Sequence, residues 1–400
     1  MKICGIPVIM YHGVGRDHPG WPWNHLVMPA GLFDGQMRLL RKKGWTTISL
    51  DQLHAHVATG AAVPDKAIVL TFDDGYRDNR VYMYPILKKH GHRAVIWMST
   101  DFADPRGDLP PTLDDVWAGR LKESELDSDG YLSWGEMREM AASGHVEIQS
   151  HAKTHTWYFS GPRIVDFHRP EGVDKYNTPQ WLIWNHFPDQ KYAAMRGTMA
   201  ERIPYGTPIY ESEKSLLVHR YFEDRDLTER LLETVAGDGG AEFFRRPDWR
   251  ERLLKTVEAF GPRNDRIETE EEYRARVKSE LLESRAKIEA EVGKPVHFLA
   301  WPGGARNELT YRLAEEAGYL ATTTRYEDHR FKNLPGEDPR GISRIGNGSQ
   351  HLYRGIISRR TDPGFFIASL DCFCGKRSAR LRLRIYKLKY LLRYLLFRVK

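Results

Sequence analysis

Short apolar runs, each suited to a buried β-strand, alternate with helix-like segments along much of the chain. The runs are rich in β-branched and aromatic residues and are too short for helices. Between the first two of them, residues 31–43 place Phe33, Met37 and Leu40 at helical spacing. Strands that alternate with helices predict a parallel sheet. In this part of the chain the predicted strands are residues 6–11, 45–50, 67–72, 94–98 and 145–151.

The same alternation returns after residue 266. A helix of about 25 residues is predicted to begin after Thr269 and to end near Gly293, where a glycine can cap it. Further strands are predicted at residues 296–301, 319–324 and 341–346. The fold class is therefore α/β, and we expect a distorted (β/α) barrel of seven to eight parallel strands with a large aromatic-rich insertion.

Residues 157–266 break this alternation. The segment is rich in Trp, Tyr, Phe, Pro and paired charges and has no clear period. It predicts an insertion or lid subdomain, in which aromatic rings would suit the faces of sugars. Alternatively, Trp181, Trp184 and Trp249 only hold a small satellite core together. The predicted domains are residues 1–156 and 267–370 as two parts of the barrel, 157–266 as the insertion, and 371–400 as a basic amphipathic tail.

The composition, 41% hydrophobic and 12% aromatic, excludes a disordered chain. The formal net charge of +6 could indicate a nucleic-acid partner, but from Cys372 onward the chain holds ten Lys or Arg and no acid. Residues 1–371 therefore carry a formal charge of −4, and no nucleic acid is expected as a partner. Three cysteines cannot build a disulfide framework, and the N-terminal apolar run is too short for a signal peptide, so a cytoplasmic location is predicted.

The tail, residues 376–400, predicts an amphipathic helix. Its apolar stripe comprises Leu381, Ile385, Leu388, Leu392, Leu395 and Val399, and its second face carries Arg382, Lys389, Arg393 and Lys400. This pattern is typical of a helix that lies in an anionic membrane interface, so peripheral contact with the inner membrane face is predicted. A helix docked on the protein with solvated cations is the alternative, and an alternating strand is a third.

Two adjacent acids, Asp73 and Asp74, follow the predicted strand 67–72 directly. Neighbouring carboxylates at a buried strand end are costly unless a cation lies beside them. Because Gly75 permits a turn, one carboxylate could bind a metal while the other faces the same cavity as a base. An Asp-Gly turn that caps a helix would also explain the motif.

His151 and His155 lie at the end of another predicted strand, residues 145–151. Their i, i+4 spacing places both imidazoles on one side of a single turn, which suits a metal site. One aspartate with two histidines would leave positions open for water and substrate, as catalytic sites do.

Further strand ends carry polar or turn-forming residues. The segment 300–304, AWPGG, forms a tight turn whose backbone N–H groups could face a cavity. His12 follows the first strand, and Arg344, in the last predicted strand, could reach the same cavity or form a structural ion pair. Four strand ends would then meet at one face, where the active sites of barrels form.

The motifs TFDDGY, SHxxxH and WPxG, set in this βα series, resemble the polysaccharide deacetylase family, which is the NodB homology domain or carbohydrate esterase family 4. Residues 1–155 and 267–346 carry the resemblance. MYH near the N-terminus, LTFDDGYxD and FLAWPGG are most similar to the poly-N-acetylglucosamine deacetylase branch, in which the family's last motif is permuted to the N-terminus.

The resemblance implies a metal-dependent hydrolase with Asp73 as the general base. This chain has Ala300 where many members have the arginine that orients the base. One divalent metal is implied, with zinc preferred and nickel, cobalt or iron(II) as alternatives. Its ligands would be Asp74, His151 and His155.

The resemblance also implies His12 as the general acid and the backbone N–H of Gly303 as a donor to the oxyanion. Substrate contacts are expected from Tyr76, Trp301 and Pro302. The expected partner is an acetylated amino-sugar glycan, and the expected reaction removes N-acetyl groups from a polysaccharide or a lipid-linked glycan precursor. An O-deacetylase, a deformylase and a non-catalytic glycan-binding protein of envelope assembly are the alternatives.

Overall fold

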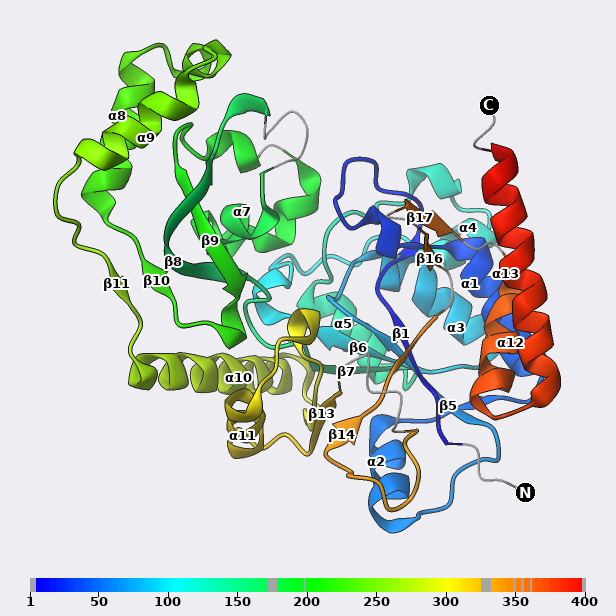
Figure 1. Ribbon diagram of the computed structural model, residues 1–400. Coiled ribbons are helices and arrows are strands. Elements are labelled where there is room, and N and C mark those ends of the chain that lie inside the picture. Colours follow the sequence, from blue (N-terminus) through cyan, green and yellow to red (C-terminus); the bar gives the residue numbers. More distant parts are fainter. Residues whose placement is uncertain are drawn as a thin grey trace.

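Eight strands form one curled parallel sheet in the computed structural model, which describes residues 5–171, 178–197, 199–324, 332–347, 350–353, 356–359 and 362–397 (Figure 1). In sheet order they are β14 (Gly341–Ile342), β13 (Ala321–Thr323), β12 (Phe298–Leu299), β7 (Val146–Ser150), β6 (Ala94–Met98), β5 (Ala67–Phe72), β1 (Val8–Tyr11) and β15 (Ile345–Gly346). A further strand, β4 (Thr46–Thr47), pairs with β5. Because β14 and β15 belong to one short segment, residues 341–346 reach both edges of the sheet. The predicted α/β fold, a distorted barrel, is confirmed.

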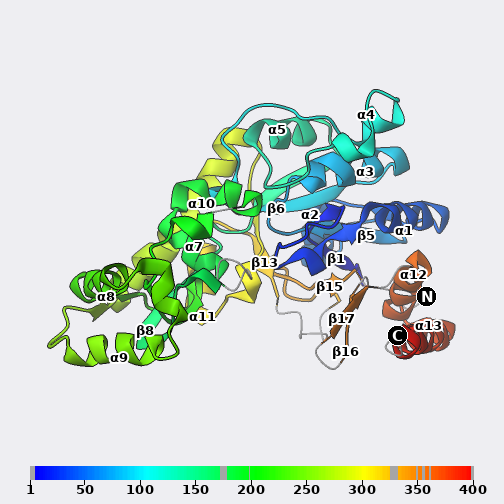
Figure 2. The ribbon, with the colours of Figure 1, turned by 90° about the horizontal axis from the view of Figure 1, so that it is seen from above.

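Alternate strand residues face two different apolar clusters, as the period of two in a strand requires. Val69 and Trp97 belong to the inner cluster, which α2 (Leu50–Thr59) closes at the lower end of the barrel in Figure 1. Leu70 belongs to the outer cluster, together with residues of α1 (Ala30–Lys42) and α3 (Tyr84–His90). Figure 2 shows the helices arranged around the sheet.

Some element boundaries differ from the prediction. The predicted strand 341–346 is two strands of two residues each, because its halves pair with opposite edges of the sheet. Ser49 caps α2 in a capping box with Gln52, which ends the predicted strand 45–50 early. The predicted helix 77–90 begins with a π-helical turn, Asn79–Met83. The long helix α10 (Glu270–Val292) is confirmed, with Thr269 at its start.

Residues 157–266 lie beside the barrel as the green elements of Figure 1. An antiparallel hairpin, β8 (Trp157–Phe167) and β9 (Pro208–Lys214), carries α7 (Gln180–His186), α8 (Arg225–Gly237) and α9 (Trp249–Ala259). The helices α8 and α9 share a separate apolar cluster, against which Trp249 packs. Trp184, in contrast, belongs to the main core. The segment therefore has a satellite core and is also anchored to the barrel through α7.

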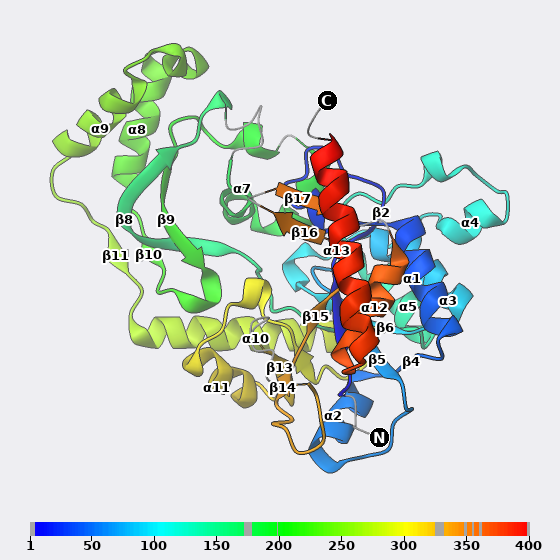
Figure 3. The same ribbon diagram turned by 45° about the vertical axis from the view of Figure 1, so that its right-hand side comes forward.

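The chain continues after the barrel as two helices along its side (Figure 3). Here α12 (Pro363–Phe373) packs on α1, and α13 (Arg377–Phe397) packs on α12. The alternating strand considered for this tail is therefore wrong. Among the described residues, no helix combines the length and apolarity needed to span a bilayer. Cys372 is a free thiol but Cys374 is disulfide-bonded, so the low cysteine count does not exclude a disulfide, and the cytoplasmic location stays a prediction.

Candidate active site

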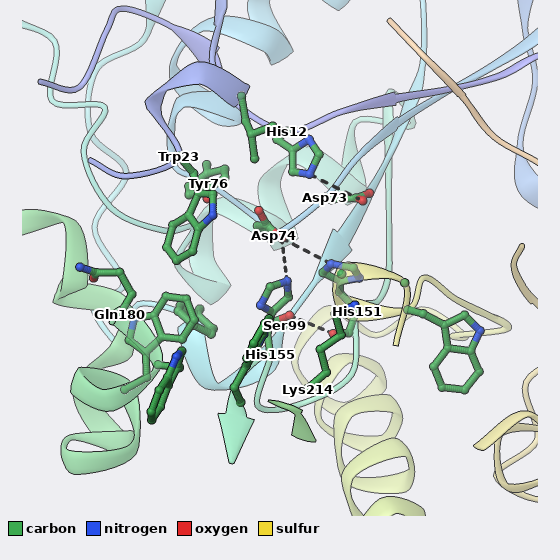
Figure 4. A pocket seen from close by; sticks show the side chains of 18 of the residues that line it. His12, Trp23, Asp73, Asp74, Tyr76, Ser99, His151, His155, Gln180 and Lys214 are labelled. Atoms are coloured by element: carbon green, nitrogen blue, oxygen red, sulfur yellow. Dashed lines mark hydrogen bonds and ion pairs between the residues drawn. The ribbon is translucent and has the colours of Figure 1, made fainter. Parts of the chain in front are cut away.

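A strained turn after β5 separates the two neighbouring carboxylates. Asp74 has a φ of 76° and Gly75 a φ of 73°, both in the left-handed region that residues other than glycine rarely adopt. A Cβ atom on Gly75 would clash with the Met98 sulfur, so a glycine is required there. The turn sends Asp73 and Asp74 to different partners (Figure 4).

Asp74 meets both predicted histidine ligands. Its Oδ1 atom lies 3.4 Å from His151 Nε2 and 3.3 Å from His155 Nε2, and all three donor atoms lie within 4.8 Å of one another. Two ligand atoms about 2.0–2.1 Å from a tetrahedral zinc ion are ~3.3 Å apart, so this spacing fits a divalent ion. Burial opposes ionisation of Asp74, but hydrogen bonds to the two imidazoles outweigh it and hold the Asp74 pKa well below its usual range.

The two histidines converge through a loop rather than through a helical turn. Ala152 and His155 adopt φ values of 58° and 40°, which fold the chain back after β7. His151 Nδ1 lies 2.8 Å from the carbonyl oxygen of Ala300, at the end of β12. This hydrogen bond orients the ring so that Nε2 faces Asp74, as the ring of a metal-binding histidine is usually oriented.

A buried network holds the same loop from outside the site. Glu280 of α10 accepts hydrogen bonds from the backbone N–H and the hydroxyl of Thr154, at 3.2 and 2.8 Å. Lys191, from residues 157–266, donates to the Thr154 carbonyl oxygen at 2.8 Å and to Asp101 Oδ2 at 3.0 Å. The barrel and the insertion therefore both fix the backbone next to His155.

Asp73 is held by an arginine. The guanidinium of Arg344 donates to both of its carboxylate oxygens, Nη1 to Oδ1 at 2.6 Å and Nη2 to Oδ2 at 3.0 Å, and both side chains are buried. Burial opposes ionisation, but the charges of Arg344 and the two nearby histidines outweigh it and hold the Asp73 pKa below its ordinary value. Arg344 thus places a guanidinium beside Asp73, although position 300 is an alanine. The sequence left open whether Arg344 reaches the cavity or forms an ion pair, and in the structure it does both, because it lines the cavity and pairs with Asp73.

These groups line one cavity of about 920 Å³. His12 lies on its wall, with Nε2 4.0 Å from Asp73 Oδ2. Tyr76, Trp301 and Gly303 also line it, whereas Pro302 is buried and is not among the lining residues, so its placement does not support a substrate contact. The fold therefore places every expected site residue except Pro302 at this one cavity.

One wall of the cavity was not predicted residue by residue. Gln180, Trp181 and Lys214 come from the insertion, and Trp23 comes from the segment between β1 and α1. Figure 4 labels Trp23, Gln180 and Lys214. The Trp23 ring stacks on Trp184, with ring centroids 5.4 Å apart. The sequence signal for this wall was the abundance of tryptophan. No local pattern shows which of the rings face the barrel.

Comparisons with known proteins agree with this geometry. Residues 60–196 match the family model "Polysaccharide deacetylase". The chain is 27% identical over 154 residues to YxkH, a candidate polysaccharide deacetylase of Bacillus subtilis, a match of 38% of this chain and 44% of that protein. It is 33% identical over 122 residues to the poly-β-1,6-N-acetyl-D-glucosamine N-deacetylase of Escherichia coli K12, a match of 30% of this chain and 16% of that protein. These matches therefore span less than half of either relative.

A solved de-N-acetylase of Aggregatibacter actinomycetemcomitans has a similar fold. The likeness covers 85% of this chain and 94% of that one, with a TM-score of 0.50 and 18% sequence identity, and it shows the fold alone. The matched residues 60–196 include both aspartates and both histidines of the site, and three of these, Asp74, His151 and His155, lie close enough together to hold a metal ion. Over this segment, the chain is similar to the polysaccharide deacetylase family.

Proposed function

We propose that the protein hydrolyses the N-acetyl amide of an amino sugar within a glycan and that it uses one divalent metal ion. One observation carries this proposal: a three-donor metal site, a separately held carboxylate and an imidazole all line one cavity. Amide hydrolysis needs these three parts, because water must be activated, the oxyanion stabilised and the departing amine protonated.

Asp74, His151 and His155 would hold the ion, and we propose zinc because this donor set at tetrahedral spacing suits it. Bound there, the ion supplies Lewis-acid chemistry that polarises an acyl carbonyl and lowers the pKa of water. Nickel, cobalt and iron(II) accept the same donors, so reconstitution with each metal decides its identity.

Asp73 is the proposed general base. Its lowered pKa keeps it ionised at neutral pH, and the two hydrogen bonds from Arg344 fix the plane of the carboxylate. It accepts a proton from the attacking water as the new C–O bond forms. The backbone N–H of Gly303, at the cavity wall, would donate to the oxyanion.

His12 is the proposed general acid. It would protonate the amine nitrogen as the C–N bond breaks, because an amine leaves poorly without a proton. His12 and Asp73 approach within 4.0 Å, so base and acid act on the same small region of the cavity.

The aromatic wall supports a sugar as the substrate. The partly exposed indoles of Trp23 and Trp181 line the cavity and offer flat apolar faces to a pyranose ring, and Gln180 and Lys214 offer polar groups to its substituents. The indole nitrogens of Trp184 and Trp301 are buried and have no hydrogen-bond partner among the described protein groups. The name of the E. coli relative makes β-1,6-linked N-acetylglucosamine oligomers the first substrate to test.

The test is product analysis with the zinc-loaded protein and such oligomers. We expect one primary amine for each acetate released. Acetate released from an O-acetylated sugar without a new amine would contradict the proposal in favour of an esterase, and formate from an N-formylated sugar would indicate a deformylase. No product with any of these substrates would favour a glycan-binding protein.

A further inference from the structure

Helix α13 is docked on the protein by one face only. Ala379 and Tyr390 are buried, and the rings of Tyr386 and Tyr390 pack edge-on against Phe365 of α12, with centroids 5.8 and 6.3 Å apart. At about 100° per residue, these α13 side chains share one side of the helix. The opposite side is therefore turned away from α12. Figure 1 shows α13 at the right-hand edge of the molecule, and in Figure 3 it lies in front of the other elements.

Ion pairs fix one flank of the docked helix. Lys376 and Arg382 both pair with Asp371 at 2.6 Å, and Lys389 Nζ lies 3.7 Å from Asp362. Arg382 and Lys389 were grouped in the sequence as cations that could face a membrane. The structure uses both to attach α13 to α12 instead.

A continuous apolar stripe remains exposed on the far side. Leu381, Ile385, Leu388 and Leu392 are 62%, 59%, 56% and 50% exposed, and their spacing of three or four residues aligns them along the helix. Other exposed large apolar residues in the described part of the chain are mostly isolated, as is normal on a protein surface. A row of four such residues on one helix face is typical of a surface that another body covers.

Unpaired cations border this stripe on its other flank. They are Arg377, Arg380, Arg384 and Lys387, all exposed and all without an ion pair to any described residue. No acidic residue follows Asp371 in the chain. The exposed face thus combines leucine-type side chains with uncompensated positive charge.

We infer that the outer face of α13 binds the surface of an anionic lipid bilayer, and this inference does not depend on the proposed reaction. The stripe would insert at the boundary between headgroups and acyl chains while the cations contact anionic headgroups. A second copy of this chain is a poorer occupant, because a symmetric contact would set identical cationic flanks against each other. The helix lies along the surface, consistent with the lack of a spanning helix among the described residues.

The experiment is co-sedimentation of the full chain with vesicles of phosphatidylcholine, either alone or mixed with phosphatidylglycerol. We expect binding to the mixed vesicles only. The double variant Ile385→Glu/Leu388→Glu should weaken it about tenfold or more, because two buried apolar side chains are lost. The variant Arg380→Gln/Arg384→Gln should weaken binding about fivefold per charge and reduce its sensitivity to salt.

Leu282→Glu is the matched control, since Leu282 is 41% exposed on α10, away from α13. It should bind vesicles like the wild type, and circular dichroism should show that every variant is folded. Absence of wild-type binding to the mixed vesicles, or binding that the Ile385→Glu/Leu388→Glu variant retains, would overturn the inference. A dimer that the same variant dissociates, without vesicle binding by the wild type, would show instead that the stripe is a contact between copies.

Discussion

At the scale of single residues, Asp73 and Asp74 are adjacent in the chain but have different neighbours. Asp74 faces two imidazoles, and Asp73 faces a guanidinium and the ring of His12. The left-handed backbone at Asp74 makes this divergence possible. Strain of this kind is typical of functional sites, where the surrounding structure must hold it in place.

The first prediction concerns the base. Asp73→Asn should lower kcat by about 10²–10⁴-fold, because an amide cannot accept the proton of water. Metal content should stay at the wild-type level, because Asp73 is not one of the three candidate metal ligands, Asp74, His151 and His155. Acetate release and elemental analysis of the same preparation measure both quantities. Turnover at the wild-type rate would remove Asp73 from the mechanism.

The second prediction concerns Arg344. Its charge lowers the pKa of Asp73, so Arg344→Gln should raise that pKa and move the acidic limb of the kcat/KM profile to higher pH. Arg344→Lys keeps the positive charge but loses the bidentate hydrogen bonding of the guanidinium. It should therefore shift the acidic limb of the profile less than Arg344→Gln does. Because an unpaired buried carboxylate can cost about 3–5 kcal/mol, unfolding of both variants should be measured as well. An acidic limb that does not move in the folded Arg344→Gln variant would contradict the role of Arg344.

The sequence predicted the two aspartates, the two histidines and His12 as site residues, because they lie at or shortly after the ends of strands that the apolar pattern marks. It left Arg344 undecided. Arg344 lies 271 residues from Asp73, between two strands that pair with opposite edges of the sheet. Only the closed arrangement of the sheet shows that the Arg344 side chain reaches Asp73, the proposed base.

At the scale of elements, the insertion and the barrel meet at the loop that carries the histidines. Lys191 lies on a 3₁₀ segment, Pro188–Arg196. Its side chain is 2% exposed, and its ammonium group donates to Asp101 and to the Thr154 carbonyl. Because Lys191 donates to the backbone next to His155, we propose it as a positioning residue for the candidate metal site.

The third prediction follows from this contact. Lys191→Met keeps the length of the side chain but loses its hydrogen bonds, and should weaken zinc binding by about tenfold, as the loss of partners that orient ligands does. Lys214→Met is the matched control, because Lys214 lines the cavity but its ammonium group forms no hydrogen bond or ion pair with the described residues 151–155. It should keep zinc affinity and raise KM. Competition titration with a zinc indicator measures the affinities, and equal affinity in Lys191→Met and wild type would contradict the positioning role.

Elements with a strong period were predicted well, and irregular ones were not. Thr269 and Gly293 gave the ends of α10 because capping is a local interaction. Residues 157–266 contain short 3₁₀ turns and a hairpin with register shifts, which leave no period to read. Trp184 and Trp249 therefore could not be told apart, although one packs in the barrel core and the other in the satellite core.

At the scale of the whole molecule, the site is assembled from segments across the chain. Its residues follow or adjoin β1, β5, β7, β12 and β15, and the sheet brings these strand ends to one cavity. The family match covers residues 60–196 and so excludes His12, Gly303 and Arg344. The proposed roles of His12 and Gly303 rest on the motif resemblance together with their place at the cavity, and the role of Arg344 rests on its contact with Asp73.

The fourth prediction concerns metal removal. A ligand that binds only the folded state stabilises it, by about 4 kcal/mol when present at a thousand times its Kd. Zinc should therefore raise the Tm of the wild type by several degrees, and a chelator should reverse the change. His155→Ala should show no shift with either addition. An equal rise in that variant would mean that zinc acts elsewhere on the molecule.

The claim on which the function depends is that Asp74, His151 and His155 share one divalent ion. Anomalous diffraction at the zinc edge, from crystals grown with zinc, tests it directly. We predict one strong peak within ligand distance of Asp74 Oδ1 and of both Nε2 atoms, about 2.0–2.2 Å from each. A zinc peak at other residues only, or density for water alone among these three side chains, would contradict it.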